Sequence, residues 1–386
     1  MIHNYKFKTV MKILFIIPTT KMDGSIISFL TLIKGLVAKG TQVAIVVPKS
    51  KQDDDFIHTI GELNIKCYRT TVRILAYPQK LKGWQFVYEL LSRIFYNYLA
   101  IIQILRVIKK EKPDIVHTNV GPVQCGYYAA RIARIPHVWH IREYGDLDFG
   151  MKAFPSKSSF IKKLKKGFPI CISKDLLSYN CLKDDANASV VYNGVHSKFD
   201  VRSFYPKEKY FLTSSRISSE KGFEQIIRVF ACFVRGRNDF SLKILGKGDP
   251  TYVSKLKAMC QRLNIMEKVL FVGYTNEVFQ YMEKATALLV ASKSEGFGRM
   301  TAEAAFAGCL VIGKNTAGTK EVMDITGGFR FMNDEEMLLA MKDVSCLSEN
   351  EYRIRVSKAQ HQAVAFFSNE EYINNILDVY DKILKK

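Results

Sequence analysis

The sequence predicts an α/β protein made of two doubly wound domains, each with a parallel sheet covered by helices. Short apolar segments alternate with helical ones along the 386 residues, and continuous apolar strands are typical of parallel sheets buried on both faces. The alternation stops in a polar stretch after Asn193 and Gly194 and then begins again. With 48% hydrophobic residues, the chain is long enough for two such domains, which we expect to face each other across a cleft.

The predicted strands of the first half cover residues 12–18, 43–48, 66–69, 114–118, 137–140, 170–172 and 190–192. Helices are predicted between them at residues 25–39, 53–63, 86–108 and 123–133, and Pro113 ends the long apolar one. The second half repeats the plan, with strands at 211–215, 241–245, 269–272, 287–291 and 310–312 and helices at 222–235, 252–263 and 299–307.

Positive charge is concentrated in the first half of the chain. Residues 1–192 hold 29 basic and 14 acidic side chains, so they carry +15 of the formal net charge of +20. This imbalance predicts an anionic partner: a membrane face, a lipid-linked pyrophosphate or a nucleic acid. Residues 149–174 contain seven lysines and no acidic residue, a run that is usually a solvated face but also suits an anionic bilayer.

Several features concern the cellular compartment. The eight cysteines are scattered without a Cys-x-x-Cys pair, which predicts reduced core residues in a cytosolic protein. The first apolar run fits a buried strand better than a signal peptide, and a start at Met11 would make residues 1–10 a flexible extension. Charged residues interrupt residues 86–108, so this helix is not expected to span a bilayer, and a position in the membrane interface stays open.

The segment at residues 292–311 is the most informative part of the sequence. Glu295 follows an apolar strand in a glycine-containing turn, and Glu303 lies in the small-residue helix that comes next. A glycine-rich turn that leads into a helix presents unpaired amides and a positive dipole end to a phosphate, and Gly296 and Gly298 permit close approach. Two carboxylates beside a phosphate can accept hydrogen bonds from hydroxyls, which predicts a nucleotide-sugar site.

Arg216 and Lys221 follow the first strand of the second half, five residues apart. A guanidinium and an ammonium at a strand end can hold a pyrophosphate from two directions. The alternative is an ordinary basic helix start, which is slightly disfavoured because cations there oppose the helix dipole.

Three weaker signals follow other strands. Gly246 and Gly248 mark either a tight turn or a close approach to a nucleotide, and Tyr274 could flank a base or be a surface aromatic. Gly24 lies in an Asp-Gly-Ser segment that opens a helix, where Ser25 would be the N-cap and the helix start would suit a phosphate or sugar hydroxyl.

His140 ends an apolar strand of the first half, so its side chain is expected at the ligand edge of that sheet. His117 ends the preceding strand and shares this interpretation, although a lone histidine is more often a plain core residue. Arg142 and Glu143 follow in the same loop, where they would orient a sugar or an acceptor, or pair with each other.

Taken together, these motifs resemble the retaining glycosyltransferases with the GT-B fold, in particular glycosyltransferase family 4. The resemblance covers nearly the whole chain. It rests on Met-Lys-Ile-Leu-Phe-Ile-Ile-Pro at residues 11–18, His-Ile-Arg-Glu-Tyr-Gly at 140–145, Cys-Ile-Ser-Lys at 171–174, Tyr-Asn-Gly-Val at 192–195, Arg-x4-Lys-Gly at 216–222 and Glu-x7-Glu at 295–303. The loop at residues 22–25 departs from the doubled glycine common in the family, and Ser218-Ser219 replaces a frequent proline.

The resemblance implies a role for each candidate residue. Glu295 would bind donor-sugar hydroxyls and Glu303 the ribose, while Arg216 and Lys221 would hold the diphosphate and stabilise the departing nucleotide. His140 would contact the sugar near the reacting carbon. Backbone amides of Phe297, Gly298, Met300 and Thr301 would face the sugar and phosphate, and Gly24 would lie against the phosphates.

The resemblance also implies how the chain divides. Residues 1–193, completed by a C-terminal helix at 370–386, would form an acceptor-side domain, and residues 194–369 would bind the donor. Transfer would retain the anomeric configuration and need no metal or other cofactor. The Asp-x-Asp pairs at 53–55 and 146–148 do not follow apolar strands as a metal loop would, so we expect solvated carboxylates there.

The sequence therefore predicts a cytoplasmic glycosyltransferase, peripheral at the inner membrane face, that extends a lipid-linked or oligosaccharide acceptor from a nucleotide-sugar, with uridine preferred to guanosine. Two alternatives stay open: a nucleotide-sugar 2-epimerase of the same fold, and a nucleic-acid binder, which only the charge suggests and the Glu-x7-Glu segment opposes. The donor sugar, the acceptor, the linkage and the oligomeric state do not follow from the sequence.

Overall fold

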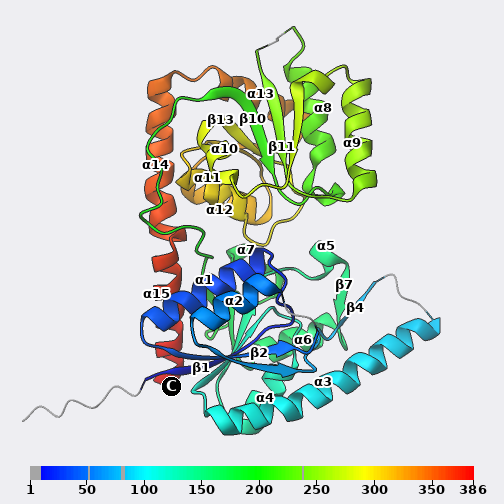
Figure 1. Cartoon of the computed structure of the whole chain (residues 1–386), viewed down its shortest axis with the longest axis vertical. Helices are drawn as coiled ribbons and strands as arrows, with labels where there is room; N and C mark the ends of the chain where they lie inside the picture. Colours follow the sequence, from blue (N-terminus) through cyan, green and yellow to red (C-terminus); the bar gives the residue numbers. More distant parts are fainter. Residues whose placement is uncertain (1–9, 51–52, 80–82, 237–238) are drawn as a thin grey trace, which may run out of the picture. The chain divides into compact units, whose positions relative to one another are not determined.

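The computed structural model describes residues 10–50, 53–79, 83–236 and 239–386; of the proposed extension at residues 1–10, only Val10 lies inside these ranges. The chain forms two compact units (Figure 1). The first contains Met1–Gly194 and Tyr372–Lys386, and the second contains Val195–Glu371.

The sheet of the first unit has seven strands in the order β3-β2-β1-β5-β6-β8-β9, all parallel to their neighbours. The strands are β1 (Lys12–Ile16), β2 (Gln42–Pro48), β3 (Lys66–Thr70), β5 (Ile115–Asn119), β6 (His137–Ile141), β8 (Phe168–Cys171) and β9 (Ser189–Val190). A separate antiparallel pair joins β4 (Ala76–Pro78) to β7 (Met151–Ala153).

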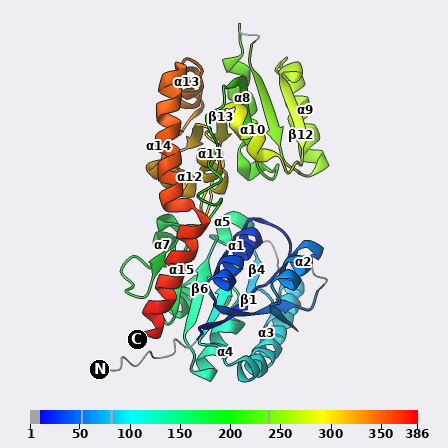
Figure 2. The same cartoon turned by 60° about the vertical axis from the view of Figure 1, so that its left-hand side comes forward.

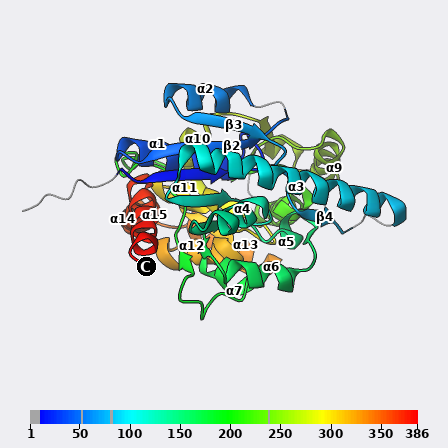
Figure 3. The same ribbon diagram turned by 90° about the horizontal axis from the view of Figure 1, so that it is seen from below.

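The helices of the first unit are α1 (Gly24–Ala38), α2 (Asp54–Glu62), α3 (Gly83–Glu111), α4 (Cys125–Ala133), α5 (Asp146–Phe149), α6 (Lys157–Leu164), α7 (Lys174–Tyr179) and, from Tyr372 onward, α15 (Asn369–Leu384). Successive side chains of β1 point to opposite faces, so Ile13 and Phe15 pack with α1, α2 and α15, while Leu14 and Ile16 pack with α3 and α4. Figure 3 shows α2 and α4 on opposite sides of this sheet.

The last helix is an integral part of the first core. Tyr372, Ile376, Val379, Tyr380 and Ile383 of α15 are all buried in the cluster that covers β1. The helix lies beside α1 (Figure 2), where a Cβ on Gly35 would come within 2.0 Å of Ile373. Glycine at position 35 therefore lets the two helices approach closely.

The sheet of the second unit has six parallel strands in the order β12-β11-β10-β13-β14-β15. They are β10 (Glu208–Ser214), β11 (Ser241–Leu245), β12 (Val269–Gly273), β13 (Ala285–Val290), β14 (Val311–Lys314) and β15 (Phe329–Phe331). The helices are α8 (Phe223–Phe233), α9 (Pro250–Arg262), α10 (Val278–Lys284), α11 (Arg299–Phe306), α12 (Ala317–Thr326), α13 (Asp334–Ser345) and α14 (Glu349–Phe367), with 3₁₀ turns η1 (Ser219–Lys221) and η2 (Met266–Lys268).

Both faces of this second sheet are covered, as continuous apolar strands predict. Phe211 and Leu289 pack in a cluster with α8, α9, α13 and α14, whereas Leu212 and Leu288 pack with α10, α11 and α12. The predicted fold class, two doubly wound Rossmann-like domains, is confirmed.

Some predicted elements were wrong in detail. The helix expected at residues 222–235 is present as α8, but the 3₁₀ turn η1 just before it was not predicted, and Gly222, whose φ of 76° is left-handed, separates the two. The sequence did not predict β15, α12, α13 or α14. The cysteines were expected in the core, but Cys67, Cys181 and Cys346 are exposed free thiols.

Helix α3 has two different halves. Its C-terminal half packs Ala100, Ile104 and Val107 against the sheet, whereas its N-terminal half extends past the strands (Figures 1 and 3). That half exposes seven large apolar side chains, which we call the apolar stripe: Trp84, Val87, Tyr88, Leu91, Ile94, Phe95 and Tyr98. Their spacing of three or four residues places them on one face of the helix. By length and composition, α3 is the one helix in the described ranges that could cross a membrane.

Candidate active site

The second unit brings two predicted residues together at the centre of its sheet. Strands β10 and β13 are neighbours, and from them the strand order proceeds outward in opposite directions. Ligands of doubly wound sheets bind at such a switch point, beyond the carboxyl ends of the strands. Lys221 comes from the loop after β10 and Glu295 from the loop after β13.

Lys221 and Glu295 form an ion pair with Nζ 2.6 Å from Oε1, and their side chains are 19% and 24% exposed. Packing requires glycine at position 222, because a Cβ there would lie 2.3 Å from the carbonyl oxygen of Ala291, at the end of β13. A second tie joins the loops, because the amide of Lys293 donates to the carbonyl of Glu220 at 3.0 Å. The two loops are therefore packed against each other, and the side chains of Lys221 and Glu295 remain partly accessible to solvent.

The loop that carries Glu295 turns sharply into α11. Gly298 precedes the helix with a φ of 83°, a conformation that favours glycine. The carbonyl of Glu295 accepts from the amide of Gly318 at 2.9 Å, and a Cβ on Gly318 would come within 2.5 Å of the backbone of Phe297. The Phe297 side chain is buried against Phe367, so any contact it makes with a ligand must come from its backbone.

Helix α11 begins with the other predicted residues of this segment. Arg299 Nε lies 2.7 Å from Glu303 Oε1, so the second glutamate of the motif is also paired with a cation. Met300 is half-buried and Thr301 is fully buried. Within the described chain, the hydroxyls of Thr301 and Thr319 have no protein hydrogen-bond partner. The first turn of α11 adds amides that the helix itself leaves unused.

Arg216, Gly246 and Tyr274 lie on loops after β10, β11 and β12. Arg216 is exposed and pairs with Glu220 at 2.9 Å. A Cβ on Gly246 would meet the carbonyl of Ser215 at 1.8 Å, so glycine here lets these two loops touch. Tyr274 is 76% exposed, and its hydroxyl donates to Asn276 at 3.0 Å.

The first unit places His140 in a buried chain of hydrogen bonds. The Tyr380 hydroxyl lies 2.6 Å from His117 Nδ1, and His117 Nε2 lies 3.1 Å from His140 Nδ1. Burial, together with the nearby charge of Arg142, lowers the pKa of both histidines well below the usual value, so both rings are neutral. If Tyr380 donates, His117 must donate from Nε2, and His140 then carries its proton on Nε2.

This arrangement defines what His140 can offer a ligand. The guanidinium of Arg142, 3.5 Å from His140 Nδ1, can only donate, which agrees with an unprotonated Nδ1. In the described residues, His140 Nε2 has no protein partner. A neutral imidazole with an N–H of fixed position can donate one hydrogen bond to a sugar oxygen.

Arg142 has a mainly internal role. Its guanidinium donates to Asn119 and Asn193, both at 2.6 Å, and to the Tyr372 hydroxyl at 2.9 Å, and the residue is 6% exposed. The hydrogen bonds of Arg142 therefore go to these neutral groups. The sequence had left open an ion pair between Arg142 and Glu143 instead.

Glu143 is partly buried close to two other carboxylates. Its pKa is raised to about 7, mainly by burial and also by the charges of Asp148 and Asp23, while the charge of Arg142 opposes the rise. A carboxyl with such a pKa exchanges its proton near neutral pH, which is typical of functional sites and of strained acidic clusters alike.

The start of α1 differs from the expectation. Asp23, not Ser25, is the N-cap, and its Oδ1 accepts from the amides of Ser25 and Ile26 at 3.0 and 3.1 Å. A carboxylate therefore occupies the amides that were expected to face a phosphate. A Cβ on Gly24 would meet nothing within 4 Å, so packing alone does not require glycine there.

Sequence reasoning missed four residues of the first site. Asn119, Asn193, Tyr372 and Tyr380 hold Arg142 and His117, yet the tyrosines lie on the last helix, far from the strand ends in sequence. The prediction of solvated carboxylates at 146–148 was also wrong. Asp146 accepts from Tyr179, and Asp148 from the amide of Tyr144.

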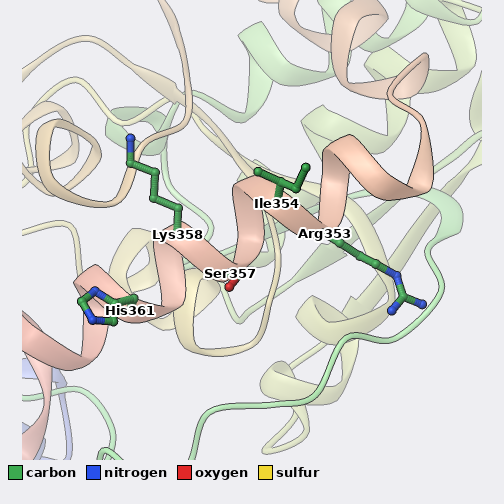
Figure 4. A pocket seen from close by; sticks show the side chains of 5 residues that line it. All are labelled: Arg353, Ile354, Ser357, Lys358 and His361. Atoms are coloured by element: carbon green, nitrogen blue, oxygen red, sulfur yellow. The ribbon is translucent and has the colours of Figure 1, made fainter.

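One cavity of the second unit contains none of the predicted residues. It has a volume of about 660 Å³ and lies along α14, lined by Arg353, Ile354, Ser357, Lys358 and His361. Figure 4 shows that these side chains leave the helix in different directions, so they do not converge on a common point. We assign no role to it.

Comparisons with known proteins bear on the family and the fold of the chain. A family model described as "Glycosyl transferases group 1" matches residues 196–362, and one described as "Glycosyltransferase Family 4" matches residues 22–199. The chain is similar to the alpha-monoglucosyldiacylglycerol synthase of Streptococcus pneumoniae, with 26% identity over 72% of each chain.

Two further likenesses add detail. Over 28% of each chain, the sequence is 34% identical to a Campylobacter jejuni protein named N-acetylgalactosamine-N,N'-diacetylbacillosaminyl-diphospho-undecaprenol 4-alpha-N-acetylgalactosaminyltransferase. Among solved structures, Anabaena HepE in complex with UDP superimposes with a TM-score of 0.77 at 18% identity, covering 96% of this chain and all of the other.

Proposed function

This chain belongs to the family 4, group 1 glycosyltransferases and has their GT-B fold, and from this premise we propose that it moves a hexose-type sugar from a UDP-sugar to a lipid-linked glycan, with retention of configuration. In this reaction the bond between the anomeric carbon and the diphosphate breaks and a bond to an acceptor oxygen forms. The acceptor hydroxyl loses its proton, and the nucleoside diphosphate leaves.

The observation that carries the proposal is the Lys221–Glu295 pair at the β10/β13 switch point. The ammonium lies where a diphosphate can approach the loop after β10, and it can compensate the negative charge that develops on the leaving group. Glu295 can accept hydrogen bonds from sugar hydroxyls while Lys221 fixes its position at 2.6 Å. Because cations on this unit supply positive charge, we propose that turnover needs no metal.

Names and ligands of similar proteins support the finer parts of the proposal. The HepE structure contains UDP, which favours uridine. The pneumococcal relative is named for a glucosylated diacylglycerol, and the Campylobacter relative for an undecaprenol diphosphate-linked glycan, so both names favour an acceptor that carries a lipid. Both names also specify an alpha linkage, which is the anomer that retention would give from an alpha-linked donor.

The same acceptor class suggests where the protein works. We assign it to the cytoplasmic membrane face, bound peripherally through the apolar stripe of α3. The excess of positive charge in residues 1–192 would strengthen binding to anionic lipids.

The test is donor hydrolysis by the purified chain across a panel of UDP- and GDP-sugars in the presence of EDTA. We expect one UDP-sugar to release UDP, and Glu295→Gln and Lys221→Met to slow this release by about 10²-fold or more, because each removes a charge that the transition state uses.

Asp239→Asn is the matched control, since it also removes a carboxylate that pairs with a lysine, in this case Lys209 near the amino end of β10. The control should hydrolyse donor at the wild-type rate. Full activity of Glu295→Gln would refute the assignment of the site. Conversion of the UDP-sugar into its epimer without transfer would instead support a 2-epimerase.

A further inference from the structure

The first unit contains a cavity of about 480 Å³ at the carboxyl edge of its sheet, which the sequence did not predict. Pro18, Pro48 and Thr70 line it, and they lie just after β1 and at the ends of β2 and β3. This is the edge where doubly wound sheets bind ligands, and the volume falls in the range of small-molecule sites.

The cavity is rich in positive charge. Lys49, Arg73 and Arg93 line it, and among the described residues of its lining there is no acidic side chain. Glu89 lies nearby, with Oε2 at 3.4 Å from Arg93 Nε, but its side chain is 43% exposed, so water weakens its effect. The lining and Glu89 together carry three positive charges and one negative charge, which favours an anion.

The two arginines are held in place by neighbouring groups. The Arg73 guanidinium lies 3.9 Å from the centre of the Tyr96 ring, and Arg93 Nη1 donates to the carbonyl of Ile74 at 3.2 Å. The wall between them is also fixed, because Thr71 donates its hydroxyl to the carbonyl of Tyr96 at 2.9 Å. Ordered guanidinium groups bind phosphate through paired N–H donors.

One wall of the cavity is α3, and this helix has two chemically different faces. Arg93 and Tyr96 face the cavity, whereas the apolar stripe lies on the outer side. A ligand that suits both surfaces combines a phosphate with a hydrocarbon chain.

We propose that this cavity binds the phosphate or diphosphate that links the glycan acceptor to its lipid, while the lipid lies along the apolar stripe. The inference rests on the proposed function and gives its acceptor a location in the first unit. It assigns Lys49, Arg73 and Arg93 to recognition of that anion.

Vesicle flotation with the full chain tests the proposal. One set of phosphatidylcholine vesicles contains geranylgeranyl diphosphate, and a second set has the same total charge supplied by phosphatidylglycerol. We expect wild-type protein to bind the diphosphate vesicles about tenfold more tightly, and Lys49→Gln/Arg73→Gln to lose this preference, because charge-assisted hydrogen bonds to phosphate disappear.

Two further variants guard against misfolding and a general charge effect. Lys34→Gln/Lys183→Gln removes the same charge from exposed positions outside the cavity and should keep the preference. Arg93→Lys preserves the charge but not the paired donors, so it should reduce the preference only partly. A wild-type preference that survives in Lys49→Gln/Arg73→Gln would overturn the proposal.

A binding measurement with free inorganic pyrophosphate distinguishes a site for a lipid-linked diphosphate from a site for a soluble anion. If pyrophosphate binds in the cavity but wild-type protein shows no preference for diphosphate vesicles, the cavity is a site for soluble anions and the lipid assignment is wrong. Donor hydrolysis, measured without acceptor, judges the proposed function by itself. If the protein prefers diphosphate vesicles but does not hydrolyse any donor, the assignment of the cavity stands and the proposed reaction is wrong.

Discussion

At the scale of single residues, Glu143 is a carboxyl group whose protonation changes near neutral pH. Its pKa is about 7 in the folded chain, whereas an ordinary glutamate has a pKa of 4.5. Between these values the folded state holds a proton that the unfolded state has released. Stability therefore falls as the pH rises from about 4.5 to about 7, and the loss is complete above that range.

The predicted consequence is a pH-dependent effect of Glu143→Gln. The amide cannot ionise, so the variant should gain roughly 1–3 kcal/mol relative to wild type at about pH 8, with little change near pH 4.5. Urea unfolding at several pH values measures the difference. A constant difference between variant and wild type at all pH values would show that Glu143 ionises normally.

Glu111 provides the opposite case in the same unit. Hydrogen bonds from Lys12, at 2.6 Å, and Tyr68 lower its pKa to about 2 although it is 4% exposed. This carboxylate stabilises the fold above its ordinary pKa and loses its effect as the pH falls toward 2. Glu111→Gln should therefore lower the free energy of unfolding most at neutral pH. Glu143→Gln should raise it there, so the two variants are expected to have opposite effects in the same urea experiment.

The candidate residues of the second unit could be named from the sequence, whereas the residues that contact Arg142 and His117 in the first unit could not. Lys221 and Glu295 could be named as candidates because each lies in a local pattern directly after a strand, Lys221 after β10 and Glu295, with Gly298, after β13. The pairing of Arg299 with Glu303 is a simple i, i+4 contact that the same pattern contained. Tyr372 and Tyr380 could not be predicted, because their contacts with Arg142 and His117 exist only once the last helix packs on the first sheet.

At the scale of elements, α3 is the feature with the clearest consequence. Its apolar stripe exposes Trp84 by 76%, Leu91 by 61% and Phe95 by 58%. Large apolar groups on one face of a helix, next to basic residues, are typical of segments that lie in a bilayer interface. Trp84→Ala/Phe95→Ala should weaken binding to phosphatidylglycerol vesicles by about tenfold or more, because each ring buries apolar surface in the bilayer.

The second unit offers a matched control for that experiment. Leu339 and Ile354 are exposed by 58% and 62%, so Leu339→Ala/Ile354→Ala removes two exposed apolar side chains from another location. Vesicle cosedimentation should show no loss for this control. Equal losses in both double variants would mean that the stripe has no special role at the membrane.

Helix α14 escaped prediction for a physical reason. Helix α14 buries Tyr352, Val356, Ala359, Ala363 and Phe367, a face built partly from alanines. Such a face gives a weak hydrophobic pattern, so periodicity does not reveal it. The capping box formed by Ser348 and Glu351 was the local signal that would have located its start.

At the scale of the whole molecule, the first unit depends on the end of the chain. Five buried residues of α15 fill the core beside β1, and each large-to-small loss in a core costs about 2–5 kcal/mol. The free energy of folding lost on deletion of residues 369–386 should therefore exceed the usual stability of a domain, about 5–15 kcal/mol. We expect this deletion to unfold the first unit. The second unit, which keeps its own core, should stay folded.

Limited proteolysis and thermal unfolding can follow the two units separately. The truncated chain should yield a resistant fragment that begins near Val195, while deletion of Lys385 and Lys386 alone should change nothing. Protection of residues 10–194 in the truncated chain would contradict this prediction.

The place of α15 in the first core also has a consequence for synthesis on the ribosome. The second unit is continuous in sequence, but the first unit receives Tyr372–Lys386 only after the whole second unit has been made. At about 5–20 residues per second, the segment between Gly194 and Tyr372 takes roughly 10–35 seconds to make. For that time one face of the first sheet lacks its covering helix. The half of the protein that is made first is therefore the half that completes its fold last, and its uncovered apolar face is the surface for a chaperone to protect.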